Sequence, residues 1–168
     1  MDFSELVTKR RSSRVFSSRS LGKEILESIV NAGRFAATAR NVQPWEFVVI
    51  TKKDTLEKIS AFAENGRFIA SAAAGIAVFC KETKYYLEDG CAATENILLA
   101  ATSYGVGSCW IAGDKKPYAQ QVNQLLHASS ELKLISLIAL GYPEQKDALP
   151  QVPKRPLEGL IHWERFGV

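Results

Sequence analysis

Hydrophobic residues recur at helical spacing in several separate parts of this chain. The spacing predicts a short helix over residues 3–9 and a second helix that follows Ser20, its expected N-cap. Two further helices are expected over residues 54–64 and around residues 119–128. The first helix runs directly into a cluster of basic residues, so the pattern already places charge at a helix end.

Short apolar runs alternate with these helices and fit buried β-strands. A polar loop over residues 38–44 ends in proline and precedes the first of them. The expected strands cover residues 45–50, 75–80, 108–112 and 132–140. This alternation predicts a central sheet flanked by helices, of the α+β or α/β class, and we expect a single domain over residues 1–168.

Residues 84–104 carry the strongest helical signal of the sequence. From Cys91 to Ala101 the segment is apolar around most of its circumference, and glycine at position 105 marks its end. A helix with so little polar surface is buried on nearly all sides. Its partner is either the rest of the domain or a second subunit.

The composition narrows the class of protein. Hydrophobic residues make up 46% and charged residues 23% of the chain, values typical of globular proteins. The N-terminus does not resemble a signal peptide, and no apolar run reaches membrane-spanning length, so we expect a cytoplasmic protein without a membrane partner. A net charge of +3 is too small to indicate nucleic-acid binding.

Cysteine and histidine offer little chemistry of their own. Cys80, Cys91 and Cys109 have no metal-site or redox-motif spacing, and we expect buried free thiols. His127 and His162 lie far apart, so no metal site is expected. The sequence also lacks the usual dinucleotide, phosphate-loop, zinc-protease and serine-hydrolase motifs. If the protein is an enzyme, a cofactor is expected to carry the reaction.

Two basic clusters are candidate anion sites. The first comprises Arg10, Arg11, Ser12 and Arg14, residue types that can surround a phosphate or face the polar edge of a heterocycle. The second is Lys154 with Arg155, in a proline-rich tail. The two clusters could converge on one anion or simply be solvated surfaces.

Two further segments have side chains or backbone suited to a flat ring. Asn41 and Gln43 precede a strand, and their amides can pair with the imide edge of a heterocycle. The small residues that end the strand at 108–112 would let backbone approach a ring.

In this order, these segments resemble the nitroreductase family of FMN flavoproteins over nearly the whole chain. The motifs that carry the resemblance are Arg-Arg-Ser-x-Arg-x-Phe (10–16), Asn-x-Gln-Pro-Trp-x-Phe-Val-Val (41–49), Glu-Asn-Ile-Leu-Leu-Ala-Ala (95–101), Gly-Ser-Cys-Trp-Ile (107–111), Gly-Tyr-Pro (141–143) and Lys-Arg-Pro-Leu-Glu with a later His-Trp (154–163).

The resemblance implies an α+β three-layer sandwich with a mostly antiparallel sheet. It also implies an intertwined homodimer, with FMN at the interface and the helix of residues 86–104 as a main dimer helix. By position, the residues that match the family's flavin contacts are Arg10, Arg11, Ser12, Arg14, Thr38, Ala39, Asn41, Ile111, Ala112, Gly113, Lys154 and Arg155. Asn65 matches a further ring contact. The loop that carries Thr38 to Asn41 would reach the flavin of the other subunit.

The activity that the resemblance implies is a ping-pong transfer of electrons from NADH or NADPH, through flavin N5, to a small oxidised molecule. An arginine, Arg11 or Arg14, would stabilise negative charge on the ring, and no catalytic side chain is required. One alternative is the same fold with other chemistry, such as dehalogenation, dehydrogenation or flavin remodelling. A second alternative is a non-enzymatic basic binding module.

Overall fold

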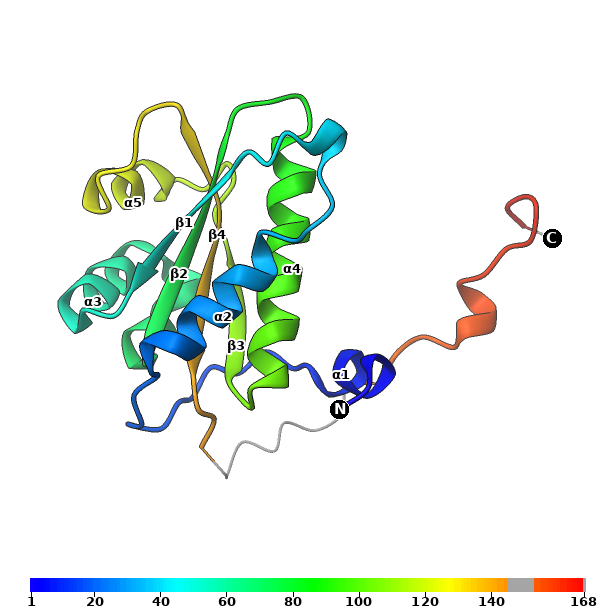
Figure 1. Ribbon diagram of the computed structural model, residues 1–168, viewed down its shortest axis with the longest axis horizontal. Coiled ribbons are helices and arrows are strands. Elements are labelled where there is room, and N and C mark those ends of the chain that lie inside the picture. The colour runs from blue at the N-terminus through cyan, green and yellow to red at the C-terminus, as the bar shows by residue number, and fades with distance from the viewer. Residues whose placement is uncertain (145–152, 168) are drawn as a thin grey trace.

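The computed structural model describes residues 1–144 and 153–167 (Figure 1). Four strands form its sheet: β1 (Trp45–Ile50), β2 (Ala74–Lys81), β3 (Gly107–Ala112) and β4 (Leu132–Gly141). The α-helices are α1 (Phe3–Lys9), α2 (Lys23–Gly33), α3 (Lys53–Phe62), α4 (Tyr86–Ser103) and α5 (Ala119–Leu125). Short 3-10 helices, named η, are η1 (Ala39–Asn41), η2 (Glu64–Ser71) and η4 (Leu157–Gly159).

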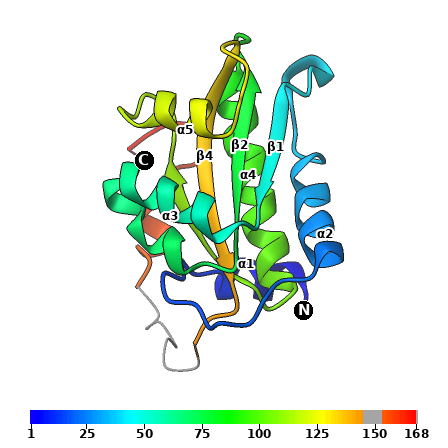
Figure 2. The same cartoon turned by 90° about the vertical axis from the view of Figure 1, so that its left-hand side faces the viewer.

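The sheet is antiparallel throughout and has the strand order β1-β2-β4-β3. Helices α2 and α4 cover one face, and α3, α5 and η2 cover the other (Figure 2). Since both faces are covered, the two central strands are almost continuously apolar, and seven of the eight residues of β2 are buried. The expected α+β three-layer fold is confirmed.

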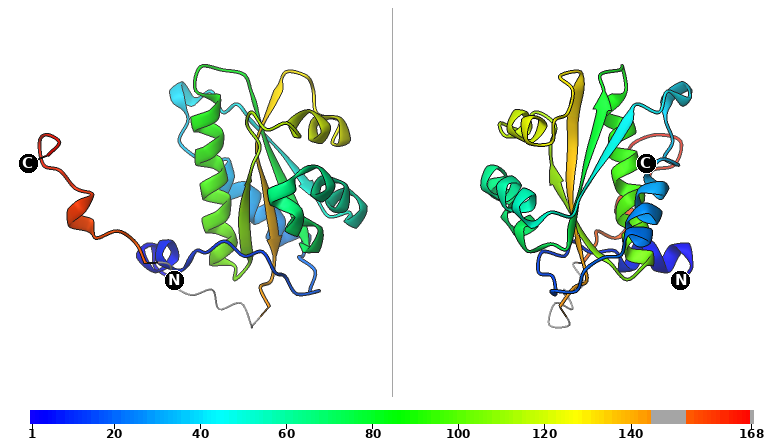
Figure 3. Two further views of the ribbon diagram at one scale, coloured as in Figure 1. Left: turned by 180° about the vertical axis from the view of Figure 1, so that it is seen from behind. Right: turned by 60° about the vertical axis from the view of Figure 1, so that its left-hand side comes forward.

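Helix α4 lies along the sheet beside α2, as the view from behind also shows (Figure 3). Its residues Asp89, Ala93, Ile97 and Ala101 are spaced four apart and are all buried, which defines the face that packs inward. On its outer side, Glu95 is exposed and several small or apolar residues are half-buried. Within one chain, α4 is therefore covered less completely than the sequence predicts.

Two helix boundaries and one short helix are the main differences from the sequence-based expectation. Helix α2 begins at Lys23 with Gly22 as its N-cap, not after Ser20, because the chain stays extended to pack Leu21 against the core. The 3-10 helix η2 was not predicted. Helix α5 ends at Leu125, three residues before the predicted end.

The tail is extended over residues 153–156, as the prolines predict, and then forms η4. The prolines at positions 143, 150, 153 and 156 predict an extended tail up to Leu157, and the part of this prediction between residues 145 and 152 falls outside the described residues. Across the described ranges, no helix combines the length and apolar character needed to cross a membrane.

Candidate functional site

The basic segment that follows α1 lies along the outer edge of β3. Ser12 forms a parallel bridge with Ser108, and the backbone N–H of Ser13 donates to the carbonyl of Ser108 at 2.9 Å. This contact holds residues 10–14 in an extended conformation. Because side chains alternate along an extended chain, neighbouring residues of the segment point in opposite directions.

Arg14, Ser12 and Arg10 lie close enough to the buried thiol of Cys109 to act on its ionisation. Burial raises the pKa of this thiol, and the positive charges of Arg14 and Arg10, together with a hydrogen bond to Ser12, act in the opposite direction. The guanidinium carbon of Arg14 lies 5.6 Å from the centre of the Phe68 ring on η2. Three of the predicted site residues are thereby brought together.

Arg10 also approaches an acidic residue of α4. Its Nε lies 3.8 Å from Oε1 of Glu95, and the two side chains are 26% and 49% exposed. The segment itself passes near the C-terminal end of α4, and this side-chain pair reaches to Glu95 in the middle of the helix (Figure 1).

Arg11 points elsewhere. Its guanidinium donates to the carbonyls of Thr8 at 2.6 Å and of Arg10 at 2.8 Å, at the end of α1. It lines a cavity of about 320 Å³ with Lys9, Ser13 and Thr102. The structure therefore separates Arg11 from the other three residues of the predicted basic cluster.

The end of β3 provides a surface of small residues beside this cluster. Ile111 is buried and packs tightly against η2. A Cβ added to Gly66 of η2 would lie only 2.8 Å from Cγ2 of Ile111. Ala112 is exposed, and its carbonyl accepts a hydrogen bond from the hydroxyl of Tyr118. Gly113 donates its N–H to the carbonyl of Ile135 at 3.0 Å. The exposed Asn65 belongs to η2, which packs against this strand end.

Gly113 also allows a close approach of two strands. A Cβ at this position would lie 2.7 Å from Cγ of Leu134 and 2.9 Å from the backbone carbon of Ile135. A larger residue would therefore displace the end of β3.

The predicted loop of residues 38–44 is held, through its first two residues, on the first turn of α4. The hydroxyl of Thr38 donates to Oδ2 of Asp89 at 2.9 Å, and the N–H of Ala39 donates to Oδ1 at 3.3 Å. Asn41 is exposed and accepts from Nε2 of Gln43 at 3.1 Å. Asp89 was not among the sequence candidates. Its place on the buried four-residue repeat of α4 is the signal that could have found it.

The basic segment and the loop lie at opposite ends of α4 (Figure 1). The helix has 18 residues, a length of roughly 27 Å at 1.5 Å per residue. Lys154 and Arg155 are exposed in the tail, which reaches away from the three layers, and Arg155 donates to the carbonyl of Gly159 at 3.1 Å. A single chain thus does not bring the basic segment, the loop and the tail together.

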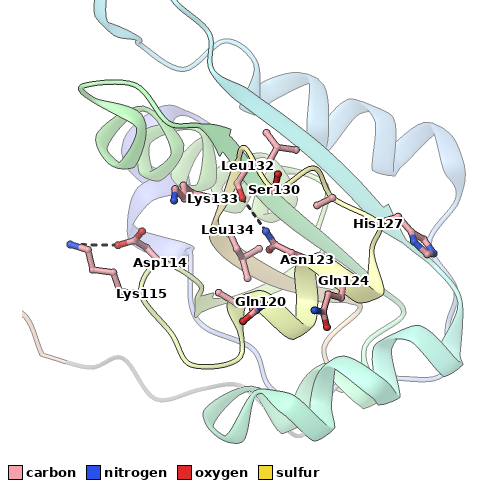
Figure 4. Close-up of a pocket in the computed structure, with 12 residues that line it drawn as sticks. Asp114, Lys115, Gln120, Asn123, Gln124, His127, Ser130, Leu132, Lys133 and Leu134 are labelled. Carbon is pink, nitrogen blue, oxygen red and sulfur yellow. Dashed lines mark hydrogen bonds and ion pairs between the residues drawn. The ribbon is translucent and has the colours of Figure 1, made fainter.

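A cavity of about 710 Å³ lies between α5 and the start of β4 (Figure 4). Asn123 lines it and donates from Nδ2 to the carbonyl of Leu132 at 3.0 Å. None of the predicted site residues lines this cavity, although its Asp114 follows Gly113 directly. The predicted site therefore does not coincide with this cavity of the single chain.

The site has the chemistry of an anion-binding surface next to a flat, small-residue platform. Two arginines and a serine lie along the edge of a strand that ends in the small residues Ala112 and Gly113. Guanidinium and hydroxyl donors fit a phosphate, and small residues at a strand end let a planar ring approach the backbone. Fold and site together define an α+β protein suited to a phosphorylated, ring-containing cofactor such as FMN.

The chain belongs to the nitroreductase family, whose sequence model matches residues 7–86 and 81–142. A protein of Archaeoglobus fulgidus, provisionally named an NADH dehydrogenase/NAD(P)H nitroreductase, is 33% identical over 96% of this chain and 97% of its own length. The resemblance noted in the sequence is thereby confirmed.

Solved structures agree with this assignment. A protein of Bacteroides thetaiotaomicron with the same provisional name superposes with a TM-score of 0.90 at 28% identity, over 97% of both chains. A provisionally named nitroreductase of Desulfovibrio desulfuricans, solved in complex with FMN, superposes with a TM-score of 0.83 at 27% identity, over 97% of this chain and 96% of that one.

Proposed function

We propose that this chain is an FMN-dependent oxidoreductase that passes electrons from NADH or NADPH to a small oxidised acceptor, such as a nitroaromatic compound or a quinone. Membership of the nitroreductase family supports the flavin and the reaction type. The observation that carries the proposal is the placement of Arg10, Ser12 and Arg14 along the β3 edge, where Ser12 bridges to Ser108, beside the small residues that end the strand.

The residues of the β3 edge have distinct tasks in this proposal. Arg10 and Ser12 provide charged and neutral donors for the phosphate, and Arg14 faces the polar edge of the ring. The backbone of residues 111–113 lies along the ring. When bound, FMN supplies the redox chemistry: it accepts hydride from the nicotinamide and passes electrons to the oxidant. The chain itself binds the cofactor, orients it and stabilises its negative charge.

We further propose a homodimer in which each flavin contacts both chains. In one chain the basic segment and the 38–43 loop lie at opposite ends of α4. A two-fold axis near the middle of this helix would bring the loop of one chain to the basic segment of its partner. The half-buried outer side of α4, with Cys91, Ala92 and Leu99, would lie in the interface.

Two other parts of the chain have apolar surface that a dimer would cover. Helix α1 has no buried residue, and its Phe3 is 73% exposed. In the tail, Trp163 and Phe166 are 77% and 89% exposed. Exposed aromatic residues at this density are typical of an interface. In the dimer, Lys154 and Arg155 of the tail would close on the phosphate. Residues 1–168 would act as one FMN-binding domain.

The test is the cofactor content and turnover of the purified protein. The proposal predicts a yellow protein, or one that takes up about one FMN per chain, and oxidation of NADH or NADPH that depends on an added quinone or nitroaromatic compound. A colourless protein that ignores FMN would contradict the proposal. Salt-sensitive binding of nucleic acid by that protein would favour the basic module instead.

A screen of oxidants separates reduction from the other chemistry available to this fold. Nitroaromatic compounds, quinones, free flavins and halogenated phenols, each with NADH and with NADPH, cover the acceptors that the proposal and its alternative require. Turnover of only the halogenated compounds would move the assignment to dehalogenation.

A further inference from the structure

The loop that precedes β1 has an unusual backbone. Arg40, Asn41 and Gln43 have φ angles of 55°, 56° and 51°. This left-handed region is strained for residues with a side chain, least for asparagine. Three such residues within four positions persist only where the surrounding structure imposes the conformation.

One buried carboxylate makes the contacts that impose it. Asp89 is 5% exposed and accepts hydrogen bonds from the hydroxyl of Thr38 and the N–H of Ala39, at 2.9 and 3.3 Å. Both its oxygens are used, and both partners lie immediately before the strained residues.

The contacts continue from Thr38 to the other end of the loop. The hydroxyl oxygen of Thr38 accepts from the N–H of Gln43 at 3.1 Å, which closes the loop on itself. Gln43 then donates from Nε2 to Oδ1 of Asn41 at 3.1 Å. A chain of hydrogen bonds therefore connects Asp89 to the side chain of Asn41. With its oxygen occupied in this way, Asn41 presents its amide NH₂ as a donor.

The anchor of this chain is rigid. Asp89 lies in the first turn of α4, where the positive end of the helix dipole stabilises a carboxylate. It shares the inward-facing row of α4 with Ala93 and Ile97, both fully buried. The carboxylate is thus fixed relative to the core, and the loop is fixed relative to the carboxylate.

We propose that Asp89 is a positioning residue for flavin binding: it holds the 38–43 loop in the strained conformation in which Asn41 and the loop backbone meet the flavin of the partner subunit. The inference rests on the proposed function. It assigns no catalytic contact to Asp89, which acts through Thr38 and Gln43. A carboxylate is required because both of its partners are donors, whereas an amide at position 89 offers only one acceptor oxygen.

The test compares Asp89→Ala, Asp89→Asn and Thr38→Val with the conservative variant Thr38→Ser. The control is Thr94→Val, on the same helix. Thr94 is fully buried, and its hydroxyl contacts the hydroxyl of Ser136 at 2.8 Å but does not reach the loop. This control reproduces the loss of a buried polar contact without touching the 38–43 segment.

The first readout is hydrogen exchange of the backbone amides of Ala39 and Gln43 in the FMN-free protein. We expect exchange of the Ala39 amide to rise by about tenfold or more in Asp89→Ala, and exchange of the Gln43 amide to rise by as much in Thr38→Val, because each variant removes the acceptor of that amide. Exchange of both amides should stay near the wild-type rate in Thr38→Ser and Thr94→Val. Unchanged exchange in Asp89→Ala and Thr38→Val would overturn the inference. If Asp89→Ala does not fold, the exchange rates of Asp89→Asn and Thr38→Val test the inference in its place.

The second readout is the dissociation constant of FMN. We expect it to rise by about tenfold or more in Asp89→Ala and Thr38→Val, to a smaller extent in Asp89→Asn, and to recover in Thr38→Ser. Equal losses in Thr94→Val and Asp89→Ala would show a general structural effect and overturn the inference. A wild-type protein that takes up no FMN would contradict the proposed function, whereas the exchange readout would still test the role of Asp89 in the loop.

Discussion

Replacing Arg10 with alanine tests the anion site at the β3 edge. The side chain of Arg10 is 26% exposed, and its Nε lies 3.8 Å from Oε1 of Glu95. The substitution removes one positive charge from the group formed with Ser12 and Arg14. It also leaves the carboxylate of Glu95 beside the proposed phosphate.

The expected loss of affinity follows from these contacts. A hydrogen bond to a charged group contributes about 1.5–3 kcal/mol, so the dissociation constant of FMN should rise by roughly 10- to 150-fold. The uncompensated charge of Glu95 favours the upper part of this range. Folding should change little, because the half-exposed Arg10–Glu95 pair contributes at most about 1 kcal/mol to stability.

The assay is a fluorescence titration of the FMN-free protein at two salt concentrations. Arg19→Ala is the matched control, because it removes the same charge from an arginine whose guanidinium carbon lies 3.9 Å from the ring centre of Tyr142. The double variant Arg10→Ala/Glu95→Gln should recover part of the loss and be less sensitive to salt.

Two results would refute this reasoning. One is an FMN affinity of Arg10→Ala within about threefold of that of Arg19→Ala. The other is a loss of FMN affinity that comes with a marked fall in melting temperature. The lower affinity would then reflect damage to the fold rather than a missing phosphate contact.

Three further predictions concern the dimer, the buried thiol and the core. Replacing Trp163 or Phe166, 77% and 89% exposed in one chain, with alanine should raise the dimer dissociation constant about thirtyfold or more in sedimentation experiments; unchanged association would remove the tail from the interface. Burial raises the pKa of Cys80 from 9.0 to about 12. Between these pH values the folded chain keeps the thiol proton and the unfolded chain loses it. The free energy of unfolding therefore falls by up to about 1.4 kcal/mol per pH unit as the pH rises. Denaturant titrations should show a shallower fall in Cys80→Ala, and identical slopes would contradict the shift. In Gly90→Ala, the new Cβ would lie 2.7 Å from Cγ1 of buried Ile135. The cost of overpacking, about 1–3 kcal/mol, should exceed the gain in helix propensity, about 1 kcal/mol. The melting temperature should therefore fall. A higher melting temperature would show that Ile135 can move aside.

The sequence was sufficient for the sheet and its helices because their burial is regular. The apolar runs predicted all four strands to within about two residues at each end, and the signal over residues 84–104 located α4. The 3-10 helix η2 was missed because its buried residues, Gly66 and Ile69, recur every third position rather than at the α-helical period.

The candidate site was predictable as a set of residues but not as an arrangement. The bridge between Ser12 and Ser108 keeps the segment extended. In an extended chain the side chain of Arg11 points away from those of Arg10 and Ser12. A bridge between residues so far apart leaves no pattern in the sequence. The left-handed loop was equally unpredictable, because Arg40 and Gln43 have no preference for that conformation. They adopt it in a loop whose first residues, Thr38 and Ala39, are held by Asp89 of a distant helix.

The central claim is an FMN site built from two chains, and heterodimers test it most directly. One chain carries Arg10→Ala with Arg14→Ala, the other carries Thr38→Val with Asn41→Ala, and two affinity tags isolate the mixed dimer. If each FMN site combines the basic segment of one chain with the loop of the other, one site of the heterodimer contains all four substitutions and the other contains none. We expect about half of the wild-type FMN content and turnover in the heterodimer and almost none in either homodimer. A heterodimer as empty as both homodimers would contradict it.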